Sequence, residues 1–129
     1  MEEKKGIIFE TVLSAKEKLT FIKKAKEKNY FIRVFFIGTN SPEINAARVT
    51  RRVYEGGHNV PIPKIISRYR KSIINCAIIS SMVDRLYVYD NSIDNKEAKL
   101  LFRANDGKLV KQYNEINDWA KIIYQQIKN

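Results

Sequence analysis

The segment YFIRVFFI occupies residues 30–37 and is aromatic or β-branched at almost every position. Such runs are typical of a central strand that is covered on both faces, and we expect residues 30–37 to form one. Upstream, GIIFE at 6–10 is a short apolar run that ends in an acid, which favours a buried parallel strand. Between the two runs, Ser14 offers an N-cap and apolar side chains recur at helical spacing over 15–28. Strand, helix and strand together predict a βαβ unit.

The rest of the chain continues the alternation of helices and strands. Ser41 and Pro42 mark the start of a helix that runs through Arg52 toward the Gly56-Gly57 pair. An Asn-Asp-Gly turn at 105–107 favours a β-hairpin. The other expected elements are a helix over 64–82, a strand over 86–90, hairpin strands over 98–103 and 108–113, and a closing helix over 114–127. This order predicts an α/β domain with a parallel sheet and a C-terminal hairpin.

Length and composition favour one folded domain over residues 1–129. The chain is 44% hydrophobic, with 5 Gly and 3 Pro, which argues against disorder and low-complexity repeats. No apolar stretch is long enough to span a membrane or to act as a signal peptide, so we expect a cytoplasmic protein that makes no membrane contact. Cys76 is the single cysteine and His58 the single histidine, so a disulfide and a structural metal site are both poor interpretations. Cys76 is expected in the core.

The net charge of +10 suggests an anionic partner: nucleic acid, a phosphorylated small molecule or an acidic protein. Five of the eight arginines fall between positions 48 and 70. Arg48, Arg51 and Arg52 recur at spacings of three and four, so at least two of them share a helix face and can converge on one anion. Arg68, Ser72 and Asn75 share a face of the next helix in the same way.

The loop between these two helices has the composition of a lid. Gly56 and Gly57 give it conformational freedom, and Pro61 and Pro63 stiffen its return. His58 lies in this loop and has no nucleophilic triad pattern around it, which favours a structural or anion-contacting role. A basic surface hairpin explains the same segment equally well.

Two strand ends carry polar groups where ligands bind in open α/β sheets. Glu10 and Thr11 end the first strand and are candidates for contact with a ligand. An acid that merely caps the next element is the alternative. The run Asp90-Asn91-Ser92 ends a later strand in the same way, although its pattern is that of a turn.

Taken together, FETVLS (9–14), RVTRRV (48–53), GGHNVP (56–61), RY (68–69), Asn75 and YDNS (89–92) resemble the zeta-toxin-like family of P-loop kinases. The Gly-Gly-His-x-Val-Pro loop between arginines is the specific part. Val12 stands where a Thr is usual, and Ser67 where an Arg often precedes Arg68. The larger departure is at the N-terminus, because no G-x-x-x-x-G-K-[ST] phosphate loop, and no second strand with the family's Asp base, is present.

The resemblance implies roles for individual residues. Arg52 and Arg68 would be catalytic and stabilise the transferring phosphoryl group, while Glu10 and Thr11 would bind the acceptor substrate. The lid or phosphate-binding group would comprise Arg48, Gly56, Gly57 and His58, with no metal ligand. ATP and Mg²⁺ are cofactors by resemblance only, and this chain alone is not expected to bind them, because the phosphate loop normally holds both.

The resemblance also implies a fold, a three-layer sandwich with an incomplete P-loop NTPase-like sheet. The phosphate-loop strand of such kinases lies between the strands that correspond to 7–10 and 31–37. Its absence would expose the middle of the sheet, which the chain could cover by pairing its own strands in a new order or by forming a homodimer.

Three functions stay open on the sequence. The first is a truncated zeta-toxin-like ATP-dependent phosphotransferase, inactive alone, whose partner is a phosphorylated small molecule or nucleotide. The second is a basic binding or regulatory module for nucleic acid or for a toxin or antitoxin. The third is a kinase assembled with a separately encoded phosphate-loop piece.

Overall fold

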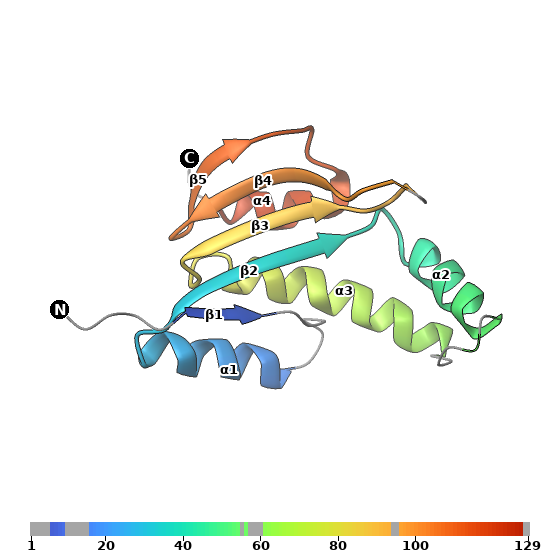
Figure 1. The fold of residues 1–129 in the computed structure, drawn as a ribbon, viewed down its shortest axis with the longest axis horizontal. Helices are drawn as coiled ribbons and strands as arrows, with labels where there is room; N and C mark the ends of the chain where they lie inside the picture. The colour runs from blue at the N-terminus through green and yellow to red at the C-terminus, as the bar shows by residue number, and fades with distance from the viewer. Residues whose placement is uncertain (1–5, 10–15, 55, 57–60, 94–95, 128–129) are drawn as a thin grey trace.

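The computed structural model describes residues 6–9, 16–54, 56, 61–93 and 96–127 (Figure 1). Its elements are β1 (Gly6–Phe9), α1 (Lys16–Glu27), β2 (Phe31–Gly38), α2 (Pro42–Tyr54), α3 (Ile62–Ile79), β3 (Arg85–Asp90), β4 (Lys99–Asn105), β5 (Lys108–Gln112), the 3₁₀ turn η1 (Asp118–Ala120) and α4 (Lys121–Gln125). None of the described helices is both long and apolar enough to cross a membrane.

The described strands form one mixed sheet in the order β1-β2-β3-β4-β5. β1, β2 and β3 are parallel, whereas β3, β4 and β5 are antiparallel. The hairpin between β4 and β5 turns at Asp106 and Gly107, both of which have positive φ (51° and 77°). A Cβ atom on Gly107 would come within 3.2 Å of the Cα of Ser81, so this turn packs closely against the chain before β3. The α/β class, the βαβ unit and the hairpin are confirmed.

β1 and β2 are direct neighbours in the sheet. Gly6 pairs with Phe31 and Phe9 with Val34, in parallel register. The position that the resemblance assigns to a further strand is therefore closed by the chain's own strands. This is the first of the two ways of covering the middle of the sheet that the sequence left open.

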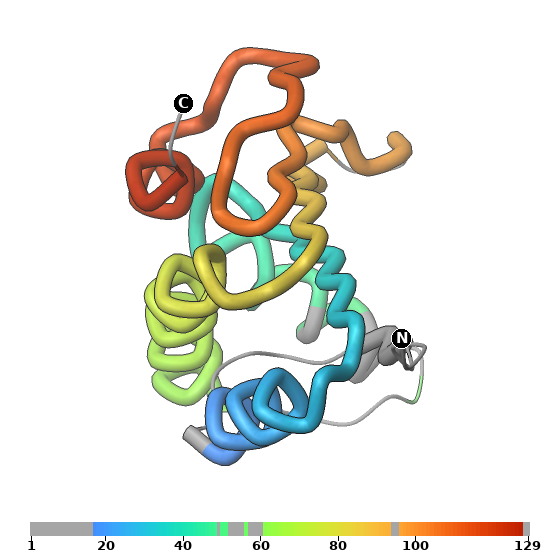
Figure 2. The backbone as a smooth tube through the Cα atoms, turned by 90° about the vertical axis from the view of Figure 1, so that its left-hand side faces the viewer, coloured from blue at the N-terminus to red at the C-terminus, as the bar shows by residue number. Residues whose placement is uncertain are grey.

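The helices α1, α3 and α4 lie on the same side of the sheet (Figure 2). Burial alternates along β2 as this arrangement requires: Ile32, Val34 and Phe36 are buried, whereas Phe35 and Ile37 are 38% and 58% exposed. The expectation that this strand is covered on both faces is wrong for the described part of the chain. There the protein has two layers rather than the three of a sandwich.

The core lies between the sheet and these helices. Cys76 is fully buried, as expected, and its burial raises the pKa of its thiol. The largest fully buried side chains belong to Phe102, Ile22, Ile32, Ile79, Leu86, Leu101 and Ile123. They come from α1, α3, α4 and three strands, so one core unites these elements.

Two helices differ from their expected bounds. α3 begins at Ile62, directly after Pro61, because proline is tolerated in the first helical turn, and it ends at Ile79 rather than at residue 82. The closing helix expected over 114–127 is wrong at its start, because helical structure begins only at Asp118. The residues before Asp118 are not helical, and Trp119 in η1 lies at the ends of β2 and β3, against Gly38 and Asp90.

Asp84 holds the amino-terminal ends of β2 and β3 together. Its carboxylate is 4% exposed, accepts a hydrogen bond from the backbone N–H of Ile32 at 2.8 Å and pairs with Lys26 at 3.2 Å. Its own N–H donates to the carbonyl of Ile32, and the N–H of Asp106 donates to the carbonyl of Asp84 at 3.1 Å. We call this group of bonds the Asp84 staple. It links β2, β3 and the β4–β5 turn.

Candidate functional site

The carboxyl ends of β2 and β3 form the candidate site, because they are adjacent parallel strands with polar residues directly after them (Figure 1). The N–H of Asn91 donates to the carbonyl of Gly38 at 2.8 Å, and the N–H of Asn40 donates to Oγ of Ser92 at 2.8 Å. The two loops that leave these strands are thus fixed to each other.

Asp90 is the carboxylate at the centre of this site and is 8% exposed. Its Oδ1 accepts hydrogen bonds from Oγ of Ser92 at 2.6 Å and from Nε1 of Trp119 at 2.9 Å, and its Oδ2 accepts one from the N–H of Ser92 at 3.3 Å. A buried carboxylate requires such donors. Trp119 also lies against Gly38, where a Cβ would come within 2.5 Å of its ring. The indole therefore joins both strand ends to the C-terminal part of the chain.

Tyr69 on α3 ties the loop after β2 to the helices. Its hydroxyl donates to the carbonyl of Thr39 at 2.8 Å, and Oγ1 of Thr39 lies 2.9 Å from the side-chain oxygen of Asn45 on α2. Burial raises the pKa of Tyr69, and the negative charges of Glu43 and Asp90 raise it further.

Arg48 connects α2 to the same strand ends. Its side chain is half-buried, and Nη2 donates to the carbonyl of Asn91 at 2.6 Å. α2 also packs against α3, and both helices lie next to the arrowhead ends of β2 and β3 (Figure 1). The segment that carries the arginine cluster of the sequence is therefore held at the carboxyl edge of the parallel strands.

The structure describes only some of the other predicted site residues. Arg68 is exposed on α3, one residue before Tyr69, and Gly56 is exposed with φ of 88°, two residues beyond the end of α2. Arg52 belongs to α2, although its side chain lies outside the described part. Glu10, Thr11, Gly57 and His58 lie outside the described residues.

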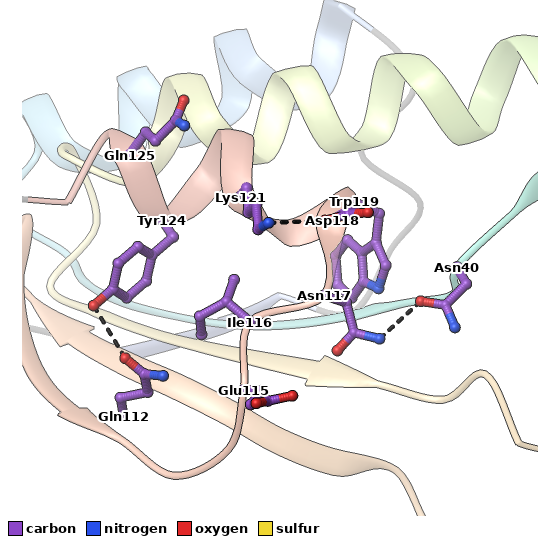
Figure 3. A pocket seen from close by; sticks show the side chains of 10 residues that line it. All are labelled: Asn40, Gln112, Glu115, Ile116, Asn117, Asp118, Trp119, Lys121, Tyr124 and Gln125. Carbon is purple, nitrogen blue, oxygen red and sulfur yellow. Dashed lines mark hydrogen bonds and ion pairs between the residues drawn. The ribbon is translucent and has the colours of Figure 1, made fainter.

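A hollow of about 970 Å³ opens beside the site (Figure 3). Nδ2 of Asn117 donates to Oδ1 of Asn40 at 2.7 Å on one side, and the hydroxyl of Tyr124 donates to Oε1 of Gln112 at 3.1 Å on the other. Its remaining lining residues are Glu115, Ile116, Asp118, Trp119, Lys121 and Gln125. A smaller hollow of about 420 Å³ adjoins it and includes Asp90, Ser92 and Lys99.

The charges of the larger hollow do not favour an anion. It carries the acids Glu115 and Asp118 against Lys121 as its one base. Nζ of Lys121 lies 2.8 Å from Oδ1 of Asp118; this hydrogen bond, together with the attraction of the charges, lowers the pKa of Asp118 and raises that of Lys121. The arginine-bearing side of the strand ends is thus the better place for a phosphate group.

Sequence reasoning missed Trp119, Asn40 and Asn117 as site residues. Trp119 falls within the closing helix expected over 114–127, and its bond to Asp90 joins positions 29 residues apart. Asn40 and Asn117 are 77 residues apart. No short-range pattern indicates such pairs, although the run of polar residues after Gly38 and after Asp90 was a signal for strand-end loops.

Asp90, the buried carboxylate at the strand ends, already accepts three hydrogen bonds. Among the described residues, no three His, Cys, Asp or Glu side chains form a group that could hold a metal ion. The sequence has no phosphate loop, whose backbone N–H groups normally surround the phosphates. That this chain alone does not bind ATP and Mg²⁺ stays a prediction from the sequence.

Comparison with known proteins leaves the family open. No protein-family model matches the chain, and no solved structure matches it. An uncharacterized protein of Haemophilus influenzae is 36% identical over 64 residues. The matched region is 50% of this chain and 46% of that protein, so the chain covers about half of its relative. The similarity to zeta-toxin-like kinases consequently stays a prediction from the motifs.

Proposed function

We propose that the chain is a fragment of a zeta-toxin-like P-loop kinase, an ATP-dependent phosphotransferase, that lacks the phosphate loop and is inactive alone. It retains the part of the fold that receives a phosphorylated small molecule or nucleotide. The observation that carries this proposal is the bond between Arg48 and the carbonyl of Asn91, which fixes the arginine-bearing helix α2 at the carboxyl ends of β2 and β3.

The geometry supports an anion site at this edge. Ligands of open α/β sheets bind beyond the carboxyl ends of the strands, and guanidinium groups are the side chains best suited to phosphate oxygens. Arg48 contributes the fixed anchor, while Arg68 on α3 is exposed directly before Tyr69, which binds the loop after β2. Arg52 and Arg68 are the residues to which the proposal assigns contact with the phosphoryl group.

For turnover, a second polypeptide would have to supply the phosphate loop, with its Ser or Thr ligand for Mg²⁺. A separately encoded piece meets this need, whereas a homodimer of this chain does not, because neither copy has a phosphate loop. No step of a reaction is assigned to the chain's own residues without it.

Calorimetry with inorganic pyrophosphate and with Mg-ATP tests the proposal. We expect pyrophosphate to bind weakly, at millimolar to high micromolar concentrations, and an Arg52→Ala, Arg68→Ala double variant to lose this binding. A matched double variant, Lys23→Ala with Lys28→Ala, removes two exposed charges on and after α1 and should bind as the parent does. Equal losses in the two double variants would reduce the effect to net charge and contradict the site.

The second candidate function is the basic binding or regulatory module. No feature of the described residues favours a toxin or an antitoxin over other proteins as the partner. Nucleic acid is favoured by aromatic rings and cations on the face of the sheet that is turned away from α1, α3 and α4, which we call the open face. This surface is separate from the strand ends.

A further inference from the structure

One face of the sheet is turned away from α1, α3 and α4 (Figure 2). This open face carries aromatic side chains of β2 and β3. Phe35 on β2 stacks on Tyr87 on β3, with ring centroids 4.7 Å apart and planes inclined by 10°. Tyr89 follows Tyr87 on the same face at the period of two that strands impose. Phe35 is 38% exposed and the neighbouring Ile37 58% exposed, so solvent reaches these rings.

Cations lie beside two further rings, those of Phe31 and Tyr113. The guanidinium groups of Arg33 and Arg85 lie 5.7 Å and 5.3 Å from the centroid of the Phe31 ring, and Nζ of Lys111 lies 5.0 Å from that of Tyr113. Arg103 on β4 pairs in register with both Tyr87 and Lys111, which places it between them.

The open face is basic without compensation from the described residues. No ion pair joins Arg33, Arg85, Arg103 or Lys111 to a carboxylate in the part of the chain that the structure describes. Nε of Arg103 is buried and finds no hydrogen-bond acceptor there. The nearby acids Asp84 and Asp90 are directed to the helix side, where they are buried.

We propose that this face binds single-stranded nucleic acid. Stacked, solvent-accessible rings offer platforms for unpaired bases, and base stacking on such rings tolerates any sequence. The cations at the margins of the rings are placed to contact the phosphate backbone. A duplex keeps its bases stacked internally and cannot use the rings, so single strands are the preferred form.

Charge also argues against a second copy of the chain as the occupant of the open face. If two open faces met about a two-fold axis, Arg33, Arg85, Arg103 and Lys111 would come close to the same cations of the second copy, and this like-charge contact opposes association. A polyanion removes that repulsion. The proposal does not rest on the kinase-like function, because it uses a different surface.

Fluorescence anisotropy with labelled 15-nucleotide oligo(dT) and oligo(U), and with a duplex of the same length, tests the proposal. We expect single strands to bind more tightly than the duplex, with affinity falling steeply as salt rises. Phe35→Leu keeps an apolar side chain but loses the ring stack, and we expect affinity to fall at least about five-fold.

Two double variants with equal charge loss separate a built face from net charge. Arg33→Ala with Lys111→Ala should lower the salt slope by about 1.4, since each phosphate contact of a single strand contributes about 0.7. Lys23→Ala with Lys28→Ala lies on and after α1, outside the open face, and should leave the slope near that of the parent. Circular dichroism of each variant shows that the fold is intact.

Four results would overturn the proposal. They are no binding at protein concentrations near 10⁻⁴ M, about the weak end of non-specific binding; equal affinity for duplex and single strand; equal effects of the two double variants; and unchanged affinity in a folded Phe35→Leu variant. Light scattering at dimer mass, with β2 and β3 face residues protected from labelling only in the dimer, would assign the face to a second copy instead.

Discussion

Gly38→Ala tests the contact that joins the C-terminal part of the chain to the strand ends. A Cβ at this position would lie 2.5 Å from two ring carbons of Trp119, which is 7% exposed and hydrogen-bonded to Asp90. The indole cannot retreat without stretching that bond, because Nε1 and Oδ1 are already 2.9 Å apart. The added methyl group therefore overpacks a constrained site.

Overpacking of this kind costs about 1–3 kcal/mol in the free energy of unfolding. For a chain of 129 residues, that corresponds to a fall of roughly 5–12 °C in the midpoint of thermal unfolding. The chain has one tryptophan, so its emission reports directly on the environment of residue 119. We expect urea unfolding followed by Trp fluorescence and by far-UV circular dichroism to show the loss, with native emission shifted to longer wavelength.

Gly56→Ala is the control for adding a methyl group where no ring is near. Unlike Gly38, which ends strand β2, Gly56 has a positive φ of 88°, and a Cβ there would meet nothing within 4 Å. This variant should lose only the cost of the left-handed conformation, about 1 kcal/mol, with native Trp emission unchanged. Gly38→Ala combined with Trp119→Leu should be less destabilised than the sum of the single variants, because the smaller side chain makes room. Parent-like stability and emission in Gly38→Ala would refute the packing of Trp119 on Gly38.

Three further predictions concern single groups. Asp84→Ala leaves the buried N–H of Ile32 without an acceptor and should lower the free energy of unfolding in urea by about 1.5–3 kcal/mol. Lys26→Ala should lower it by less than about 1 kcal/mol, because the Lys26 side chain is 40% exposed. Equal losses in the two variants would contradict the Asp84 staple. Burial raises the pKa of Tyr69 above its ordinary value of 10.0, so the stability contributed by the protonated hydroxyl is full below pH 10 and is lost as pH rises beyond it; Tyr69→Phe should therefore flatten the fall in stability above pH 10. The Cys76 thiol, fully buried and with a raised pKa, should react with a thiol reagent at pH 8 only after unfolding, and rapid labelling of the folded chain would disagree.

Strand positions were largely predictable because apolar runs bounded by Gly, Asn and Asp leave few alternatives. The sequence could not show whether both sides of β2 are covered, since Phe35 and Ile37 suit a buried face as well as an open one. Arg33 in the middle of the run was the available signal for the open face, because an unpaired guanidinium is rarely buried. Ile116 and Trp119 have helical spacing, yet residues 114–117 are not helical. The helical part begins only at Asp118, where Trp119 packs against Gly38.

The candidate site was predictable only in outline. Arg48 was recognised through its spacing within one helix, which is local information. The bonds that fix it to Asn91, and Trp119 to Asp90, join distant positions, and only the folded sheet order creates them. The roles given to Arg52 and Arg68 stay predictions.

The two ends of the β2–β3 pair are held by different kinds of hydrogen bond. At the amino end, bonds among Ile32, Asp84 and Asp106 link β2, the start of β3 and the β4–β5 turn, and two of these three bonds join backbone groups. At the carboxyl end, most bonds between segments use side chains such as those of Arg48 and Ser92, which another polar group can replace. We therefore expect the loops at the carboxyl end to open more readily than the end near Asp84. Amide exchange should accelerate from Ile32 toward Asn40, and a ligand at the open end should slow it there first.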